Sequence, residues 1–464
     1  MAELLGAHVR ETDAFTLRME RDPLLRSTIT SVALFDRPPG WELLVERVDR
    51  ATRLVPSFRE RLVPSPLGLA PPRWVVDPDF DLSWHMRRVR APAPCTLEAV
   101  LDMARVAGMS AFDPARPLWE FTLVTGLTGG RAALIMKVHH ALTDGVGGME
   151  LAALVVDQHR TQDDQGPMPD APTALRGGVA AALGESIGFG LSRWARVAHS
   201  MAAAAPGAVA EAVRHPRSTA AALASTASSL ARFVRPVTTT SSPVMTDRRL
   251  QWHFEVLDVP VAPLKAAGRA AGGSLNDAFL SALCGGLRRY HEHHGATVGA
   301  LRVAMPISVR KAGDPSGGNR ITLVRFEVPV GVTDPTCRIR TIHETSARAQ
   351  HERALPYSEA VAGVLNMLPP SVTGGMLKHV DFLASNVPGF PVAIYLGGAR
   401  VDAFYPFGPT TGAAVNVTLM SYRDTCHIGV NTDVGAVPDA DVFLRCLSEG
   451  FDEVVALAGP ARPL

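Results

Sequence analysis

The stretch Lys137-Val138-His139-His140-Ala141-Leu142-Thr143-Asp144-Gly145 decides the fold of this chain. Residues 132–138 form a nearly continuous apolar run that is too short for a helix, which predicts a strand buried on both faces. Successive side chains of a strand point to opposite faces, so the two histidines cannot enter one cavity unless the chain turns between them. We therefore expect one histidine to face a cavity at the end of a rigid strand.

The residues after the histidines predict a turn into a helix. Gly145, Gly147 and Gly148 predict a sharp bend, and residues 149–157 continue with helical spacing. A histidine has an ordinary pKa of about 6.5, which suits a general base near neutral pH. The arrangement therefore favours acid–base chemistry at this turn.

Two other interpretations of the histidine block remain open at this point. A histidine at a strand end is often a hydrogen-bonded core residue without a catalytic role. A metal site is the second alternative, but adjacent histidines diverge and no further His, Cys or Asp cluster has ligand spacing, so we predict no metal. The joint occurrence of His139, His140, Asp144 and Gly145 favours a functional site.

Length and composition indicate an ordinary globular chain. With 464 residues, of which 47% are hydrophobic, the chain is long enough for about two to three domains with sizeable cores. The formal net charge is +1, and no basic run carries interleaved aromatic residues. These two observations argue against a nucleic-acid partner.

Cysteine usage and the N-terminal sequence bear on location. The five cysteines are odd in number and lack close-paired spacing, which predicts reduced thiols and favours the cytoplasm. The N-terminus lacks a charged region followed by an apolar core, and no run of about 18 apolar residues occurs. We therefore expect neither secretion nor a membrane span. The cysteines are Cys95, Cys284, Cys337, Cys426 and Cys446.

Composition along the chain predicts three parts. Residues 1–158 mix helical and strand periods and carry the histidine block, with amphipathic helices expected at 41–54 and 97–106. Residues 159–245 begin as a polar linker and continue as an alanine- and arginine-rich helical segment. Residues 246–464 form a second half that again mixes strands and helices.

Residues 173–236 combine many alanines and serines with several arginines and few acidic residues. Such a segment could lie on an anionic membrane or lipid surface as basic amphipathic helices. A solvated or partly disordered connector between domains explains the same composition. Both interpretations stay open.

The second half has strand and helix signals of its own. Ser274 is placed to cap a helix over 278–287, with Asp277 at the capping-box position. A closing amphipathic helix is expected at 439–457. Strands are predicted at 252–259, 301–307, 321–330, 382–384, 413–420 and 426–431.

Together these motifs resemble the bacterial wax ester synthase/acyl-CoA:diacylglycerol acyltransferase family, within the CoA-dependent acyltransferases that are similar to chloramphenicol acetyltransferase. The resemblance spans nearly the whole chain. The histidine block is shared with peptide-synthetase condensation domains and fixes only the superfamily, whereas the other blocks narrow the resemblance to neutral-lipid enzymes. These blocks are Arg116-Pro117-Leu118-Trp119-Glu120, Asn276-Asp277, Pro306-Ile307-Ser308-Val309-Arg310, Gly318-Asn319-Arg320, Ser385-Asn386-Val387-Pro388-Gly389 and Ser421-Tyr422.

The resemblance implies an α/β fold of two chloramphenicol acetyltransferase-like domains, with mixed sheets flanked by helices and a substrate tunnel at their interface. His140, the second histidine of the motif, would be the general base that deprotonates the acceptor hydroxyl. His139 and Asp144 match positions that are mainly structural in the superfamily. Asp144 would turn from the tunnel to pair with an arginine, for which Arg310 is the candidate.

Other residues match positions that hold structure or substrate in the family. Asn276 could also simply occupy the first turn of a helix that Asp277 caps. Residues 385–389 could be an ordinary proline-glycine turn, or a turn whose backbone amides face the developing oxyanion. The matched residues are Gly145, Asn276, Asp277, Asn319, Ser385 and Asn386.

The resemblance implies an acyl-CoA-dependent O-acyltransferase that passes a long-chain acyl group to diacylglycerol or to a long-chain alcohol. Acyl-CoA would be a substrate, and no cofactor is expected because a thioester is already activated. The expected location is the cytoplasm, with peripheral contact at the inner membrane face or at lipid inclusions as an option. Two alternatives remain, namely acylation of a polyketide- or peptide-derived alcohol and a non-catalytic lipid-surface protein.

Overall fold

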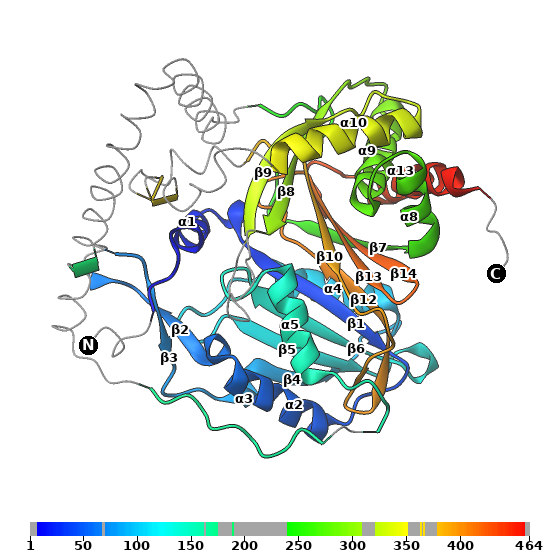
Figure 1. Cartoon of the computed structure of the whole chain (residues 1–464). Coiled ribbons are helices and arrows are strands. Elements are labelled where there is room, and N and C mark those ends of the chain that lie inside the picture. Colours follow the sequence, from blue (N-terminus) through cyan, green and yellow to red (C-terminus); the bar gives the residue numbers. More distant parts are fainter. Residues whose placement is uncertain are drawn as a thin grey trace, which may run out of the picture.

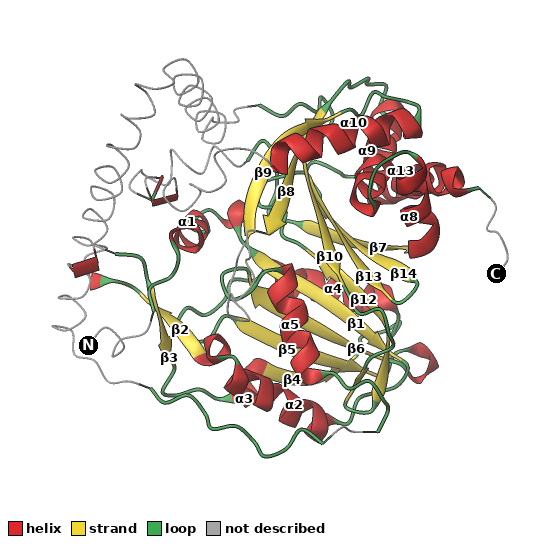
Figure 2. Cartoon of the chain, viewed as in Figure 1, coloured by secondary structure: helices red, strands yellow, loops and turns green. Residues whose placement is uncertain are grey.

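Figure 1 shows a computed structural model of the chain. Residues 7–66, 70–161, 164–174, 188–189, 239–308, 321–350, 362–363, 365–366 and 378–459 are described. Within them two six-stranded sheets dominate, one in the upper and one in the lower half of the view. Helices lie against both sheets (Figure 2).

The first sheet has β6 (Ala132–His139) near its centre, in the strand order β11-β12-β1-β6-β5-β4. β1 (Thr28–Phe35) pairs antiparallel with β6, from Thr28 opposite His139 to Phe35 opposite Ala132. Apolar clusters cover both faces of this sheet, so the first four residues of β6 are buried. The strand predicted at 132–138 is confirmed. The remaining strands are β4 (Met86–Arg90), β5 (Trp119–Thr125), β11 (Tyr395–Leu396) and β12 (Ala399–Phe407).

The second sheet has the order β7-β14-β13-β10-β8-β9. β10 (Phe382–Pro388) lies between β13 (Val415–Tyr422) and β8 (Leu301–Ser308), and both pairings are parallel. The strands predicted in this half are confirmed, although β10 runs beyond the expected 382–384. The other strands are β7 (Trp252–Pro260), β9 (Ile321–Val328) and β14 (Thr425–Asp433).

Helix α9 (Leu275–His293) is the central helix of this half, and residues 277–287 of it are buried. Its N-terminus carries the predicted capping box, in which the Ser274 hydroxyl accepts the Asp277 N–H and the Asp277 carboxylate accepts the Ser274 N–H. Three further helices pack against α9 (Figures 1 and 2). They are α8 (Val261–Ala270), α10 (Pro335–Gln350) and α13 (Ala440–Val455).

Helices on the first sheet follow the sequence prediction closely. α2 (Trp41–Leu54) spans the predicted residues, and α4 (Leu97–Met109) ends slightly later than predicted. α4 packs on both β1 and β7. A Cβ on Gly108 of α4 would lie 2.8 Å from Oγ1 of Thr30, so a glycine lets the elements approach closely. Further elements are α1 (Glu11–Met19), α3 (Leu82–His85), α5 (Gly145–Val155) and the ribbon of β2 (Glu60–Val63) with β3 (Arg73–Val76).

Strand β12 joins the two halves of the chain. It follows β10 in the sequence but pairs with β1 in the first sheet, with Thr30 opposite Phe407. A Cβ on Gly429 of β14 would lie 1.9 Å from the Pro406 carbonyl oxygen, so β12 crosses β14 at a point that only glycine allows. The sequence prediction assigned all of 246–464 to a second domain, whereas β11 and β12 complete the first sheet.

Candidate active site

A cavity of about 510 Å³ lies between the two sheets and continues along the first one. Strand alternation decides which side chains line it. Every second residue from Ser27 to Phe35 along β1 does so, as does every second residue from Leu134 to His140 along β6. Residues of β8, β10 and β13 line the cavity from the second sheet. The cavity therefore lies at the interface where the family resemblance implies a tunnel.

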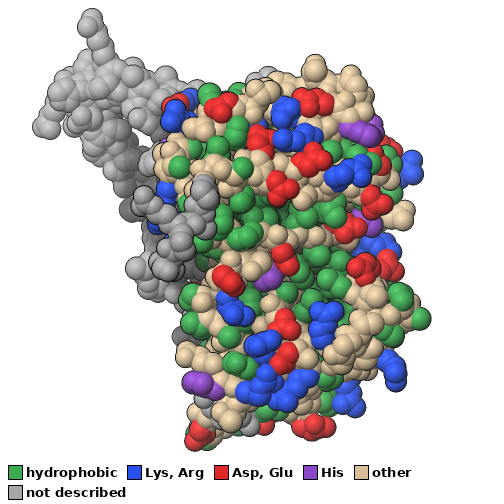
Figure 3. Space-filling model, turned by 90° about the vertical axis from the view of Figure 1, so that its right-hand side faces the viewer, with side chains coloured by type: hydrophobic (Ala, Val, Ile, Leu, Met, Phe, Trp, Pro, Cys, Tyr) green, Lys and Arg blue, Asp and Glu red, His purple; other side chains and the backbone are tan. Residues whose placement is uncertain are grey.

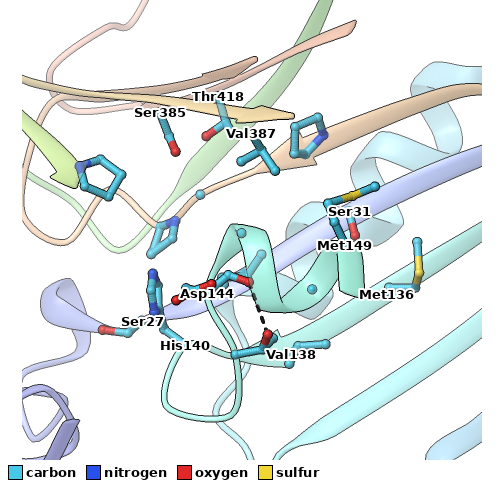
Figure 4. Close-up of a pocket in the computed structure, with 18 of the residues that line it drawn as sticks. Ser27, Ser31, Met136, Val138, His140, Asp144, Met149, Ser385, Val387 and Thr418 are labelled. Carbon is cyan, nitrogen blue, oxygen red and sulfur yellow. Dashed lines mark hydrogen bonds between the residues drawn. The ribbon is translucent and has the colours of Figure 1, made fainter. Parts of the chain in front are cut away.

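His140 directly follows β6, and its ring lines the cavity (Figure 4). Its backbone N–H donates to the Ser27 carbonyl at 2.9 Å, which extends the pairing of β1 with β6 by one residue. His139, the last residue of β6, is 1% exposed and is not among the described residues that line the cavity. The alternation of the strand thus separates the two histidines.

The buried His139 holds the turn that carries its neighbour. Its Nδ1 accepts the Ala141 N–H at 3.0 Å, so the ring proton lies on Nε2. This Nε2–H donates to Oε1 of Glu20 at 2.7 Å. The same Glu20 oxygen accepts the Ser27 N–H at 2.7 Å. Glu20 therefore fixes both backbone segments that flank His140.

The surroundings of His140 keep its ring neutral. Burial is the largest influence and lowers the pKa of His140 below its ordinary value, because the charged imidazolium loses hydration. A charge on His139 would act in the same direction, whereas the carboxylates of Asp144 and Glu20 oppose the shift in part. A neutral imidazole has a lone pair that can accept a proton, so His140 can serve as a base.

Asp144 caps helix α5, and this corrects one prediction. Its Oδ1 accepts the Gly147 N–H at 2.8 Å, and its carbonyl accepts the Gly148 N–H. The glycines predicted to form a sharp bend instead form the first turn of α5, and none of them has a positive φ. The helix starts at once because Asp144 supplies the cap.

Gly145 has a packing role in this first turn. A Cβ at this position would lie 2.8 Å from Cγ2 of Val387 on β10. The absent side chain therefore lets α5 approach the second sheet beside the cavity that both elements line.

Residues 385–388 lie in a strand that ends just before Gly389, so this segment is not the proline-glycine turn that the sequence suggested. Residues 382–388 form β10 and pair with β13, with Ser385 opposite Thr418. The pairing of β10 with β8 covers only Phe382 and Leu383. The two strands therefore separate beyond Leu383, where Ser385, Asn386 and other residues line the cavity.

Ser385 and Thr418 lie across the cavity from His140 (Figure 4). The Thr418 hydroxyl donates to Oδ1 of Asn416 at 2.9 Å, and the Asn416 amide donates to the Pro409 carbonyl. The Ser385 hydroxyl has no hydrogen-bond partner in the described part of the chain. Its hydroxyl is thus able to donate to a bound substrate.

Asp277 connects two helices at a distance from the cavity lining. Its carboxylate caps α9, accepts a hydrogen bond from Nδ1 of His343 at 2.9 Å and accepts another from the Ser346 hydroxyl at 3.1 Å. Neither Asp277 nor Asn276 is among the described residues that line the cavity. The structural alternative for Asp277 is thus the one that these contacts support.

Two predicted site residues, Arg310 and Asn319, lie outside the described residues, as does most of 173–236. Their predicted roles stay predictions. Across the described ranges, no group of three or more His, Cys, Asp or Glu side chains is arranged to hold a metal ion.

Sequence reasoning missed strand β1 and the residues around it. The run Thr28–Phe35 is rich in β-branched and apolar residues, and this composition was the signal for a strand. Glu20, in contrast, carries no local signal, because its partner His139 is 119 positions away.

A histidine at the end of a central strand faces a cavity between two mixed sheets, which is the arrangement that the resemblance to chloramphenicol acetyltransferase-like acyltransferases implies. Solved structures share this fold over nearly the whole chain. The wax ester synthase/diacylglycerol acyltransferase from Marinobacter aquaeolei VT8 has a TM-score of 0.65 at 20% identity and covers 98% of this chain and 100% of its own. The first condensation domain of the calcium-dependent antibiotic synthetase, in complex with substrate analogue 2a, has a TM-score of 0.62 at 15% identity, covering 98% and 97%. The expected fold is confirmed.

Sequence comparisons narrow this class. Residues 9–279 match the wax ester synthase/diacylglycerol acyltransferase catalytic domain, and residues 317–454 match the C-terminal domain of the same family. A Mycobacterium tuberculosis protein named as a diacylglycerol O-acyltransferase is 38% identical over 99% of this chain and 94% of its own length. Another protein of that species and name is 29% identical over 91% of this chain and 90% of its own length. The chain belongs to the wax ester synthase/diacylglycerol acyltransferase family and is an acyltransferase.

Proposed function

We propose that this acyltransferase moves a long-chain acyl group from acyl-CoA to diacylglycerol, giving triacylglycerol, or to a long-chain alcohol, giving a wax ester. The observation that carries the proposal is the position of His140 at the end of β6, with its ring in a largely apolar cavity. Such a cavity suits aliphatic substrates whose one reacting group is a hydroxyl. The names of the relatives support the same substrate class.

In the proposed reaction, the unprotonated ring nitrogen of His140 takes the proton of the acceptor hydroxyl while that oxygen attacks the thioester carbonyl carbon. The carbon–sulfur bond then breaks, and its electron pair leaves with the sulfur. His140 returns the proton to the thiolate, so the products are an ester and free CoA. A thioester is an activated donor, and we propose that no cofactor takes part besides this substrate.

We assign the oxyanion donor to Ser385. The negative charge develops on the former carbonyl oxygen, and a donor across the cavity from the base is placed to stabilise it. Ser385 faces His140 from β10, and its hydroxyl is not engaged by another described residue (Figure 4). Thr418 is less suitable because its proton is used by Asn416.

In this proposal His139, Asp144 and Gly145 hold the turn that carries the base. Arg310 remains the proposed partner of Asp144. Asn276, Asn319 and Asn386 remain proposed substrate-positioning residues, and Asn386 is the one whose place in the cavity lining supports this role.

The test compares the purified wild-type protein with His140→Ala, using labelled palmitoyl-CoA and dioleoylglycerol. Loss of the base should reduce triacylglycerol formation by about 10²- to 10⁴-fold. His293→Ala, at an exposed position near the end of α9, is the matched control and should retain activity. Equal rates in His140→Ala and wild type would show that the base is assigned wrongly. Offering palmitoyl-CoA to a panel of alcohols then identifies the acceptor.

We further propose that the enzyme works in the cytoplasm with peripheral contact at the inner membrane face or at lipid inclusions, where its substrates accumulate. No helix in the described ranges is long and hydrophobic enough to cross a bilayer. The face in Figure 3 mixes acidic and basic side chains around a band of hydrophobic ones. The arginine-rich sequence of 173–236 supports the contact instead, and flotation with anionic liposomes, with and without this segment, tests it.

A further inference from the structure

Arg325 brings a positive charge to the cavity from the second sheet. The charged or titratable residues in the described cavity lining are His140, Asp144 and Arg325. Burial favours the neutral form of His140, and the Asp144 carboxylate caps α5. Arg325 belongs to β9, the described edge strand of the second sheet (Figure 1). A guanidinium has five N–H donors, so it can bind a substrate oxygen in addition to groups of the protein.

Strand register places Arg325 on the same face of the second sheet as the proposed oxyanion donor. Arg325 is opposite Ala304 of β8, and Ala304 is opposite Leu383 of β10. All three residues line the cavity, so their side chains leave the same face of the sheet. Ser385 lies two residues beyond Leu383 on β10 and also lines the cavity. Ala304 carries only a methyl group and thus leaves the space above β8 to longer side chains.

The distance from Arg325 to Ser385 follows from strand geometry. Adjacent strands lie about 4.8 Å apart, and a strand rises about 3.3 Å per residue. Two strand spacings and two residues therefore put the Cα atoms of Arg325 and Ser385 about 12 Å apart. An extended arginine side chain covers about half of this separation. The guanidinium can thus reach a group that lies a few atoms away from the reacting hydroxyl.

The two acceptors of the proposed function differ at that distance from the hydroxyl. In 1,2-diacylglycerol, ester groups stand one and two carbons away from the carbon that carries the free hydroxyl, and each ester has a carbonyl oxygen that accepts hydrogen bonds. A long-chain alcohol has only methylene groups there. A guanidinium covered by methylene groups loses hydration without gaining a hydrogen bond. Arg325 therefore suits diacylglycerol better than an alcohol.

We propose that Arg325 binds the acceptor, donating a hydrogen bond to an ester carbonyl of diacylglycerol, and so makes the enzyme prefer diacylglycerol over long-chain alcohols. This inference rests on the proposed function and names the residue that selects the acceptor. A hydrogen bond from a charged donor is stronger than one between neutral groups. The ester carbonyl is not a reacting atom, so the bond holds the bound substrate and the transition state alike. Its loss should therefore raise KM more than it lowers kcat.

A pair of matched acceptors tests this bond directly. Dioleoylglycerol and its diether analogue, 1,2-di-O-oleylglycerol, have nearly the same shape, but the diether lacks both carbonyl oxygens. With palmitoyl-CoA as the donor, the wild-type enzyme should prefer the diester. Arg325→Met keeps a long side chain without N–H donors, and the ratio of kcat/KM for diester over diether should fall at least about tenfold. Arg348→Met, at a 76% exposed position on α10, is the control and should keep the wild-type ratio.

The ratio separates substrate binding from structural damage. An equal loss of activity toward both acceptors in Arg325→Met would overturn the inference, because a structural defect does not distinguish the diester from the diether. An unchanged ratio would overturn it as well. A wild-type enzyme that acylates neither dioleoylglycerol nor hexadecanol would instead refute the proposed function.

A second measurement does not depend on turnover. A ligand that binds the folded protein raises its Tm, so thermal unfolding with dioctanoylglycerol or with 1,2-di-O-octylglycerol compares the binding of diester and diether. The diester should raise the Tm of the wild-type protein more, and Arg325→Met should abolish this difference. Arg325→Lys keeps the charge and should retain part of the difference, and it replaces Arg325→Met if that variant does not fold. Equal Tm shifts with both ligands in the wild-type protein would contradict the inference.

Discussion

Oε1 of Glu20 lies 2.7 Å from Nε2 of His139 and 2.7 Å from the backbone nitrogen of Ser27. One carboxylate oxygen therefore accepts two hydrogen bonds, from the residue before His140 and from the residue whose carbonyl holds the His140 N–H. Glu20 is not among the described residues that line the cavity. It is a positioning residue for the base.

Two variants of Glu20 distinguish the effect of its hydrogen bonds on the position of His140 from the effect of its negative charge. Glu20→Gln can keep an accepting oxygen in the same place, so kcat at neutral pH should change little. Its lost negative charge should move the acid limb of the kcat–pH profile to lower pH, because the carboxylate raises the pKa of His140. Glu20→Ala removes both bonds, and kcat should fall about tenfold or more while KM changes less. Identical pH profiles and rates in all three proteins would contradict the positioning role.

The pH dependence of the wild-type enzyme should report on His140. Burial lowers the pKa of this histidine, and only its neutral form can accept the hydroxyl proton. The plateau of kcat should therefore extend below the ordinary histidine pKa of about 6.5 before activity falls in acid. A steady-state profile of kcat against pH measures this limb. An acid limb centred above about 6.5 would be incompatible with the described burial.

Packing of α5 on β10 can be tested with a double-mutant cycle. Gly145→Ala should lower the free energy of unfolding by about 1–3 kcal/mol, because the added Cβ would lie 2.8 Å from Val387. In a Val387→Ala background, Gly145→Ala should lower the free energy of unfolding by a smaller amount, since the clashing methyl group is gone. Urea unfolding of the four proteins gives the coupling energy. If Gly145→Ala lowers the free energy of unfolding equally in both backgrounds, residues 145 and 387 are not in contact.

Asp277 should matter for stability more than for turnover. Asp277→Ala removes the capping box of α9 and should lower the free energy of unfolding by about 1–2 kcal/mol. Well below the unfolding temperature, kcat should stay close to the wild-type value, because Asp277 is not among the described lining residues. His343→Ala is a control of small expected effect, since that side chain is 51% exposed. A large loss of kcat with unchanged stability would restore a substrate-positioning role.

Local patterns in the sequence predicted much of this structure. The apolar run before His139 predicted β6, and the amphipathic period at 41–54 predicted α2. The pair Ser274 and Asp277 predicted the cap of α9. Each of these features depends on residues close together in the chain. The same kind of pattern predicted that one histidine at the strand end faces a cavity, and the family resemblance implied that this histidine is His140.

Features that depend on distant contacts were not predictable in this way. The bend expected at Gly145 is a helix start, because β10 packs against it and Asp144 caps it. Residues 385–388 of the expected turn are in a strand, because β13 pairs with them. No local pattern links Glu20 to His139, since only the folded sheet brings them together.

The pairing of β12 with β1 has a consequence for how the chain is made. During synthesis, β1 and β6 leave the ribosome long before residues 399–407 do. Until β12 is made, β1 is therefore an exposed edge strand whose backbone N–H and C=O groups on one side are unpaired. The native sheet cannot finish until translation is nearly complete, which makes folding slow and dependent on distant contacts. A fragment that stops before residue 399 should aggregate, and two separately expressed halves should recover solubility only when they are produced together.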